Sequence, residues 1–238
     1  MKIALLGYGT MGREIEAIAL ERGHSVPVKI TTSNGDETSD ADLADCDVAI
    51  DFSHPDSAVE LISRSLKQGV PTVSGTTGWL DHWDDVLALR ADVNGALFYA
   101  SNFSLGVNVF FALNQRLAQL MNPFEEYEVD MMEMHHVRKK DAPSGTAISL
   151  AEDIIGALER KSGWTLENAR EINELAIRSE REGDVPGTHE VVYESSIDQI
   201  TIRHEAKNRK GFALGAVLAA EWLPGKTGVY GMKDLLNL

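Results

Sequence analysis

Residues 3–12 read IALLGYGTMG, and this stretch decides the fold of the first half of the chain. A wholly apolar run, residues 3–6, precedes glycines at positions 7, 9 and 12. Apolar residues then recur at helical spacing until Gly23, and residues 26–30 form a second apolar run. The pattern predicts a buried strand, a tight turn, an amphipathic helix and a second strand within about 30 residues.

The glycines have the spacing G-x-G-x-x-G, which is typical of a dinucleotide-binding turn when a strand precedes it and a helix follows. Glycine lets the backbone turn sharply and approach a pyrophosphate, while the amides at the helix start point at the negative charge. The alternative is that the glycines only serve a tight turn. We expect dinucleotide binding, with contacts from Gly7, Tyr8, Gly9, Thr10, Met11 and Gly12.

The end of the second predicted strand bears on the choice of coenzyme. An acidic residue about 20 residues after the glycines would hold the adenosine ribose hydroxyls and favour NAD. Here residues 31–36, TTSNGD, place neither an acid nor an arginine at the strand end. Asp36 and Glu37 come late and are expected to be loop residues, whereas Lys29 and the nearby hydroxyls could accept a 2′-phosphate. NADH and NADPH therefore both remain open as the cofactor.

Short apolar strands alternate with helices through the rest of the first half. Strands at residues 47–53, 70–74 and 96–99 predict a doubly wound parallel sheet, whose ligands bind outside the carboxyl ends of the strands. Small and hydroxyl residues at these ends suit a nicotinamide ring and its ribose, although ordinary turn chemistry explains each one equally well. The candidates are Ser53, Gly75, Thr76, Thr77, Ala100, Ser101, Asn102 and Phe103.

The second half of the chain follows a different pattern. Helices are expected at residues 107–121 and 145–160, with a strand at 127–134 between them. Residues 165–168 have a capping-type sequence, which predicts a shorter helix or a turn. Further strands are expected at residues 174–178, 190–195 and 200–205. Their short connections predict antiparallel neighbours in an open mixed sheet, whose uncovered face favours self-association.

The end of the chain is expected to return to the first half. Residues 212–221 predict a buried helix, and residues 230–235 predict a terminal segment that packs on the first domain. The expected fold class is therefore α/β, with a Rossmann-type dinucleotide-binding domain formed by residues 1–104 and 213–238. Residues 105–212 would form an α+β domain for substrate binding and oligomerisation.

Residues 135–147, HHVRKKDAPSGTA, gather two imidazoles, three cations and a helix start in one strand-to-helix connection. A metal site is not expected, because adjacent histidines on a strand point to opposite faces and no second cluster has ligand spacing. Ser144 stands where it suits a helix cap better than a nucleophile. A solvated cationic loop is the simplest alternative to a functional site.

The remaining interpretation of this connection is a carboxylate site with acid catalysis. Residues 144–146 would supply amides and hydroxyls at the positive end of a helix dipole. Lys139 would supply a mobile ammonium group, and His135 or His136 can titrate near neutral pH. If a nicotinamide delivers hydride to a C=C or C=N bond, the combination predicts a reductase of a small carboxylated substrate.

The composition narrows the partners and the location. The chain has 22 Lys and Arg against 37 Asp and Glu, and its formal charge of -15 argues against binding nucleic acid or an anionic membrane. Cys46 is the only cysteine, so no intrachain disulfide can form. No stretch approaches the roughly 18 apolar residues of a membrane span, and the N-terminal apolar run is too short for a signal peptide. We therefore expect a cytoplasmic protein.

Residues 133–147, EMHHVRKKDAPSGTA, resemble the signature of the 4-hydroxy-tetrahydrodipicolinate reductase (dihydrodipicolinate reductase) family of lysine and diaminopimelate biosynthesis. The pattern E-x-H-H-x-x-K-x-D-A-P-S-G-T is long and specific. The resemblance extends over essentially the whole chain. It includes the G-x-G-x-x-G start and residues 51–53, 75–78, 102–108 and 228–234.

The resemblance implies a reaction and a role for these residues. The reaction would be the reduction of 4-hydroxy-tetrahydrodipicolinate to tetrahydrodipicolinate, with His135 as proton donor or acceptor and Lys139 as the proton donor paired with hydride transfer. The residues expected to bind the cyclic dicarboxylate are His136, Gly145 and Thr146, with help from Lys139 and Ser144. The family's cofactor contacts map onto residues 7–12, 75–77 and 100–103.

The resemblance also implies an assembly, and it leaves alternatives. Family members are typically homotetramers formed through the C-terminal sheet, in agreement with the uncovered sheet face. Many relatives carry an acidic residue near Thr31, which this chain lacks, so the cofactor is expected to be NADH or NADPH. The competing functions are another two-domain dehydrogenase of an amino or imino acid, such as aspartate dehydrogenase, and a regulator that senses NAD(P) without turnover.

Overall fold

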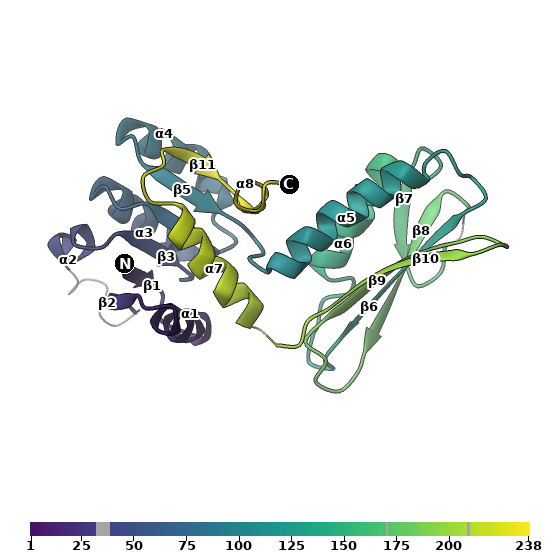
Figure 1. The fold of residues 1–238 in the computed structure, drawn as a ribbon, viewed down its shortest axis with the longest axis horizontal. Helices are drawn as coiled ribbons and strands as arrows, with labels where there is room; N and C mark the ends of the chain where they lie inside the picture. The colour runs from purple at the N-terminus through teal and green to yellow at the C-terminus, as the bar shows by residue number, and fades with distance from the viewer. Residues whose placement is uncertain (32–38, 170, 209) are drawn as a thin grey trace. The chain divides into compact units, whose positions relative to one another are not determined.

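The computed structural model describes residues 1–31, 39–169, 171–208 and 210–238 (Figure 1). The chain divides into two compact units, Met1–Leu105 with Lys210–Leu238, and Gly106–Arg209. The boundaries expected from the sequence, after residues 104 and 212, lie within a few residues of these limits. Asp36 and Glu37, which bear on the coenzyme, lie outside the described residues, as does most of the 31–36 segment.

The first unit contains a six-stranded sheet in which all neighbouring strands are parallel. The strand order is β2-β1-β3-β4-β5-β11. The strands are β1 (Lys2–Leu6), β2 (Ser25–Ile30), β3 (Val48–Asp51), β4 (Thr72–Ser74), β5 (Ala96–Tyr99) and β11 (Gly228–Tyr230). The order reverses between β1 and β3, because the chain adds β2 on one side of β1 and then builds outward from the other. Crevices at such a reversal bind ligands in doubly wound folds.

Apolar side chains cover both faces of this sheet. Ile3 and Leu5 of β1 point into a core that includes helices α1 (Thr10–Glu21) and α7 (Lys210–Trp222). Their neighbours Ala4 and Leu6 point into a second core on the opposite face. That face is covered by α2 (Asp40–Ala44), α3 (Pro55–Lys67), the short 3-10 helix η1 (Leu80–His82) and α4 (Trp83–Asp92). The alternation along one buried strand explains why a wholly apolar run forms a central strand.

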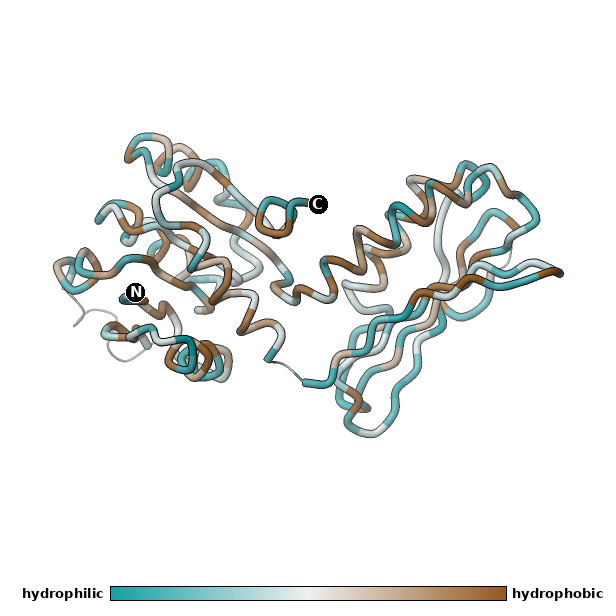
Figure 2. The backbone as a smooth tube through the Cα atoms, viewed as in Figure 1, coloured by the Kyte–Doolittle hydropathy of each residue, from teal (hydrophilic) through white to brown (hydrophobic). Residues whose placement is uncertain are grey.

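The end of the chain returns to the first unit, as the sequence predicts. Helix α7 is predominantly hydrophobic (Figure 2) and packs against α1. Strand β11 then pairs with β5 in parallel, with Gly228 opposite Ala96, and becomes the edge of the sheet. The last helix, α8 (Met232–Leu236), contributes Met232 to the core shared with α1.

The second unit has a five-stranded mixed sheet in the order β10-β9-β6-β8-β7. Helices α5 (Leu105–Met121) and α6 (Gly145–Ala157) lie on one face of it (Figure 1), and their apolar residues share a core with the sheet. The strands are β6 (Glu128–His135), β7 (Gly163–Leu166), β8 (Glu174–Arg181), β9 (Thr188–Glu194) and β10 (Gln199–Glu205). The predicted fold class, α/β with a second domain built on a mixed sheet, is confirmed.

Two predictions for the second unit were wrong. The helix or turn predicted to start at Thr165 does not begin there, because Gly163–Leu166 pairs in parallel with β8 and forms the edge strand β7; the chain bends only at residues 167–168. The strands β8 and β9 are not neighbours, although only six residues connect them, because β6 lies between them. Two strand spacings amount to about 10 Å, and six extended residues reach roughly 20 Å, so the link can pass the end of β6.

None of the helices in the described ranges is long and apolar enough to cross a membrane.

Candidate active site

In the first unit, a cavity of about 380 Å³ lies at the point where the strand order reverses. It is bounded by the segments that follow β1, β3 and β4, three strands that end at the same edge of the sheet. The residues that line it are Gly9, Thr10, Met11, Phe52, Ser53, Pro55, Gly75, Thr76 and Thr77. Seven of the residues considered as cofactor contacts from the sequence therefore line one cavity, together with Phe52 and Pro55, which were not considered.

The three glycines of the motif have different surroundings. Gly7 has a φ of +95°, and a Cβ there would lie 2.3 Å from the carbonyl oxygen of Phe52. A Cβ on Gly12 would lie 2.5 Å from the carbonyl oxygen of Gly7, so this position allows the helix to pack closely. Around Gly9, in contrast, a Cβ would meet nothing within 4 Å. Gly7 and Gly12 are required by the fold, whereas Gly9 leaves open space at the start of α1, where a pyrophosphate binds in dinucleotide folds.

The segment after β4 is held by contacts with the segment after β3. A Cβ on Gly75 would lie only 2.3 Å from the ring of Phe52, which packs in turn against Phe103 with 5.6 Å between ring centroids. The Ser53 amide donates to Thr76 Oγ1 at 2.9 Å. These contacts fix the shape of the hollow before any ligand enters it.

The buried carboxylate of Asp51 holds together the segments that follow β3 and β4. Asp51, at the end of β3, accepts hydrogen bonds from the hydroxyls of Ser53 at 2.6 Å and Ser74 at 2.7 Å. Burial raises the pKa of Asp51, although the hydrogen bonds from both serines act in the opposite direction. Asp51 therefore joins the ends of β3 and β4 beneath residues that line the cavity, such as Ser53.

The other predicted cofactor residues of the first unit lie apart from the lining of this cavity. The hydroxyl of Tyr8 donates to Glu16, which also pairs with Lys29, and the Lys29 ammonium lies 5.0 Å from the centre of the Tyr8 ring. The ammonium group considered for a 2′-phosphate is thus held by a carboxylate.

The segment 100–103 follows β5. The amide of Ala100 donates to the carbonyl of Ser74, and the ring of Phe103 is buried in the core. Ser101 is exposed, and Asn102 accepts the amide of Ser104 at 2.9 Å.

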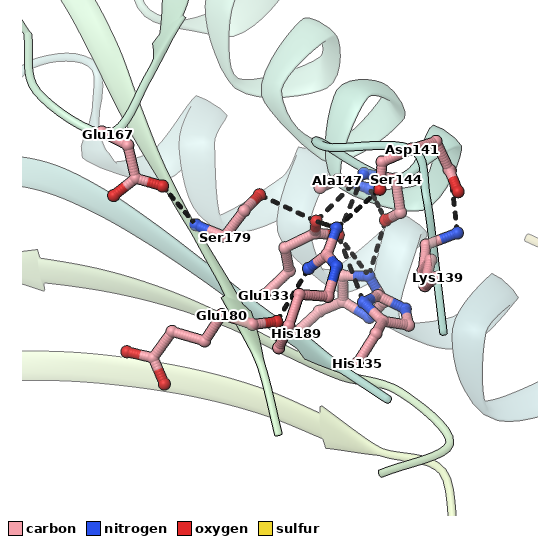
Figure 3. A network of polar contacts seen from close by, with 11 residues as sticks. Glu133, His135, Lys139, Asp141, Ser144, Ala147, Glu167, Ser179, Glu180 and His189 are labelled. Carbon is pink, nitrogen blue, oxygen red and sulfur yellow. Dashed lines mark hydrogen bonds and ion pairs between the residues drawn. The ribbon is translucent and has the colours of Figure 1, made fainter. Parts of the chain in front are cut away.

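In the second unit, the predicted residues lie where β6 ends and α6 begins (Figure 3). Ser144 caps α6, because its side-chain oxygen accepts the amide of Ala147 at 3.2 Å. The amide of Ser144 donates to both carboxylate oxygens of buried Glu133, each at 3.1 Å. The hydroxyl of Ser144 also lies 3.2 Å from Nε2 of His189. The polar atoms of Ser144 therefore bind protein groups, which indicates that Ser144 positions the helix start.

Gly145 and Thr146 differ from Ser144, because the first amides of a helix have no partner within it. A Cβ on Gly145 would meet nothing within 4 Å, so the space beside this residue is open. The amides lie at the positive end of the α6 dipole, which attracts a carboxylate.

His135 lies at the end of β6 and is almost fully buried. Its Nδ1 is 3.5 Å from Glu133, and its ring meets the ring of His189 edge-on, with 5.1 Å between centroids. Burial lowers the pKa of His135; Glu133 acts against this effect, and Lys139 and Arg181 reinforce it. The imidazole is therefore held in surroundings that make its protonation sensitive to nearby charges.

Lys139 and His136 complete the predicted set. The ammonium group of Lys139 donates to Asp141 at 2.8 Å, and the side chain of Lys139 is about four-fifths buried. The pKa of Asp141 is lowered, chiefly by this hydrogen bond. His136 is half-buried, and its carbonyl accepts the amide of Lys139 at 3.0 Å in the turn after β6. The connection thus brings both histidines and the lysine close to the start of α6.

Two family models match the chain. "Dihydrodipicolinate reductase, N-terminus" matches residues 1–103, and "Dihydrodipicolinate reductase, C-terminus" matches residues 106–236. The chain belongs to the dihydrodipicolinate reductase family.

Relatives that match over nearly the full length of the chain support the same family. The 4-hydroxy-tetrahydrodipicolinate reductase of Christiangramia forsetii is 52% identical over 239 residues, which cover 100% of this chain and 98% of the relative. The enzyme of the same name from Neisseria meningitidis serogroup B is 36% identical over 232 residues, which cover 94% and 84%. The prediction that the chain is a reductase of this family is confirmed.

A solved member of the dihydrodipicolinate reductase family has the same fold. The dipicolinate-bound dihydrodipicolinate reductase from Paenisporosarcina sp. TG-14 has a TM-score of 0.78 at 22% identity, and the match covers 98% of each chain.

Two residues of the dihydrodipicolinate reductase signature and His189 of β9 form a group with metal-ligating atoms. The ligand atoms of Glu133, His135 and His189 all lie within 4.8 Å of one another. Both oxygens of Glu133, however, already accept protein donors, including the amide of Ser144 and the guanidinium of Arg181 at 3.1 Å. The positive charge that balances this carboxylate is supplied by the protein.

In each of the two units, several residues of the candidate site were not assigned a role from the sequence. Phe52 and Pro55 line the cavity, and Asp51 supports it. In the second unit these residues are Glu133, Ser179, Arg181 and His189. Glu133 belongs to the signature, but Ser179 and Arg181, which bind it, come from a strand about 50 residues further along the chain. No local sequence pattern predicts these contacts.

Proposed function

We propose that the chain reduces 4-hydroxy-tetrahydrodipicolinate to tetrahydrodipicolinate with NADH or NADPH, in the biosynthesis of lysine and diaminopimelate. The observation that supports this most is the connection between β6 and α6. There a buried histidine, a lysine and an open helix start, all within the family signature, lie together. Net reduction takes up one hydride and one proton and releases one water, so the site needs a proton source and a grip on the substrate carboxylates.

The first unit would hold the dinucleotide. Residues 9–11 and 75–77 fit the group, because Gly9 leaves the start of α1 open and Gly75 lies flat against Phe52. The predicted contacts of Gly7, Tyr8, Gly12 and residues 100–103 belong to the same proposal. A bound nicotinamide would supply the hydride.

The second unit would hold the substrate and move the proton. The amides of Gly145 and Thr146, at the positive end of α6, would bind one carboxylate, with His136 as a further donor. The Lys139 ammonium would give the proton that accompanies hydride transfer, and Asp141 holds that ammonium in place until then. His135 would exchange a proton with the substrate.

The decisive experiment supplies the substrate, made from pyruvate and aspartate semialdehyde, and follows the nicotinamide absorbance with NADH and with NADPH in parallel. Oxidation of either cofactor supports the proposal, and the ratio of the two kcat/KM values decides the coenzyme. Absence of oxidation with both would refute it. Oxidation of aspartate with NAD or NADP in the same preparation would instead indicate the aspartate dehydrogenase alternative.

We also propose that the protein is a cytoplasmic homotetramer assembled through the sheet of the second unit. The face away from α5 and α6 carries half-buried apolar side chains, Met132, Met134 and Val192, beside the charged residues Arg178 and Glu190. Sedimentation velocity at micromolar protein is expected to give a tetramer, and Val192→Lys is expected to shift it to smaller species. A wild-type monomer under these conditions would contradict the assembly.

A further inference from the structure

Glu133 is a fully buried carboxylate that connects three elements of the second unit. It belongs to β6, and its oxygens accept the amide of Ser144 at the start of α6. From β8, the hydroxyl of Ser179 donates to it at 2.8 Å (Figure 3). The guanidinium of Arg181, also on β8, donates to it at 3.1 Å. Glu133 thus connects β8 to the start of α6 and lies 3.5 Å from His135 Nδ1.

Glu133 also acts on the charge of His135. The groups that face this imidazole are Glu133 on β6, Arg181 on β8, His189 on β9, and Lys139 and Asp141 in the connection to α6. Lys139 and Arg181 are cations, and they disfavour protonation of His135. Glu133 is 3.5 Å from Nδ1 and is the larger of the two negative influences. Without it, burial and the cations Lys139 and Arg181 would lower the pKa of His135 further.

The carboxylate is well suited to this task because it stays ionised. Burial by itself would raise its pKa, but the hydrogen bonds from Ser144 and Ser179 outweigh burial and hold the pKa of Glu133 below its usual value. His189, whose pKa is lowered to about 4 by burial, stays neutral beside it. The negative charge of Glu133 is therefore constant over the pH range in which His135 titrates.

We propose that Glu133 is a positioning residue of the reduction site, which acts through His135 by keeping its imidazole protonatable and through α6 by fixing the amide of Ser144. The proposal rests on the proposed function, because it assigns a supporting residue to the same site. It differs from a purely structural role, in which the hydrogen bonds of Glu133 would matter and its charge would not.

The test replaces the charge and keeps the shape. In Glu133→Gln, the imidazole of His135 loses its nearest anion, so its pKa is expected to fall by about one unit. The alkaline limb of the kcat profile should move to lower pH by the same amount. The titration is followed by NMR on ¹⁵N-histidine-labelled protein without substrate, with the His135 resonance assigned by its loss in His135→Asn.

Two further variants separate charge from structure. Ser179→Ala removes one hydrogen bond to Glu133, while the amide of Ser144 and the guanidinium of Arg181 still bind the carboxylate, so it should lower stability and move the His135 titration less than Glu133→Gln does. Arg181→Gln removes a cation that opposes protonation, so it should raise the pKa of His135. This opposite sign keeps the proposal testable if Glu133→Gln does not fold.

The outcomes distinguish the proposal from the function on which it rests. A His135 titration that is unchanged in Glu133→Gln, or in Arg181→Gln where the first variant is unfolded, would overturn the role of Glu133. The titration needs no turnover, so it remains decisive even if the wild-type protein fails to reduce the substrate, a result that would refute the proposed function alone.

Discussion

Gly9→Ala should separate nucleotide binding from folding. A Cβ at this position would meet no protein atom within 4 Å, and the backbone of Gly9 is extended, with φ -85° and ψ -150°. The fold therefore has room for the methyl group. It would project into the hollow at the start of α1, in the space proposed for the pyrophosphate. We expect a folded protein that has lost nucleotide affinity.

The expected magnitude follows from the size of the added group. Forcing one methyl group into a filled space costs about 1–3 kcal/mol, and a factor of ten in affinity corresponds to about 1.4 kcal/mol. The dissociation constant of NADH or NADPH should therefore rise roughly 5- to 150-fold. Gly9 is also the N-cap of α1, and alanine is a poorer cap, so a stability loss of up to about 1 kcal/mol is expected as well.

The assay pairs isothermal titration of both nucleotides with chemical denaturation, and Gly12→Ala is the contrasting variant. A Cβ on Gly12 would lie 2.5 Å from the carbonyl oxygen of Gly7, so backbone must move and the fold itself should be destabilised. Gly9→Ala is thus expected to lower nucleotide affinity with little loss of stability, whereas Gly12→Ala is expected to destabilise the fold. Wild-type nucleotide affinity in Gly9→Ala would show that no ligand approaches the backbone there, and the assignment of the cavity would be wrong.

Three further predictions concern the second unit. Lys139→Ala should lower kcat by about 10²–10⁴ while nucleotide affinity, measured by titration, stays unchanged; an unchanged kcat would remove Lys139 from proton transfer. Ser144→Ala should cost about 1 kcal/mol of unfolding free energy and raise KM, whereas Ser39→Ala, the loss of the cap of α2, should cost stability alone. Because burial lowers the pKa of His189 to about 4, below its unfolded value, the unfolded state takes up the proton first. The contribution of His189 to the free energy of unfolding is present above pH 6.5 and should be lost as the pH falls towards 4. Chemical denaturation of His189→Gln should show a smaller loss of stability over the same pH range.

The elements that could be predicted from the sequence are those with local signals. The strand, turn and helix of residues 3–22 are marked by an apolar run, glycine spacing and helical periodicity, all within one short segment. Strand β7 was missed because it has only four residues, is partly exposed and lies at the edge of the sheet. It is stabilised by its pairing with β8, and no short window of sequence contains that information.

The candidate site of the second unit likewise contains residues with a local sequence signal and residues without one. His135, Lys139 and the start of α6 could be found, because one continuous signature contains them. The groups that set their charges could not, since Glu133 meets Ser179 and Arg181 across the sheet and His189 arrives from a third strand. Alternation along β6 shows only that Glu133 and His135 share a face. It does not show that this face is buried at that end.

The wrong prediction about strand neighbours explains that burial. Had β8 and β9 paired directly, β6 would have been left with a single neighbour on one side, and His135 would lie at the edge of the sheet, open to water. Instead, β6 is between them, and the link 182–187 crosses its end, where the amide of Glu182 donates to the carbonyl of His135 at 2.8 Å. A Cβ at Gly187, the last residue of the link, would lie 3.1 Å from His135 Nε2. The crossing excludes water from the imidazole, and only because water is excluded can a single carboxylate such as Glu133 govern its protonation.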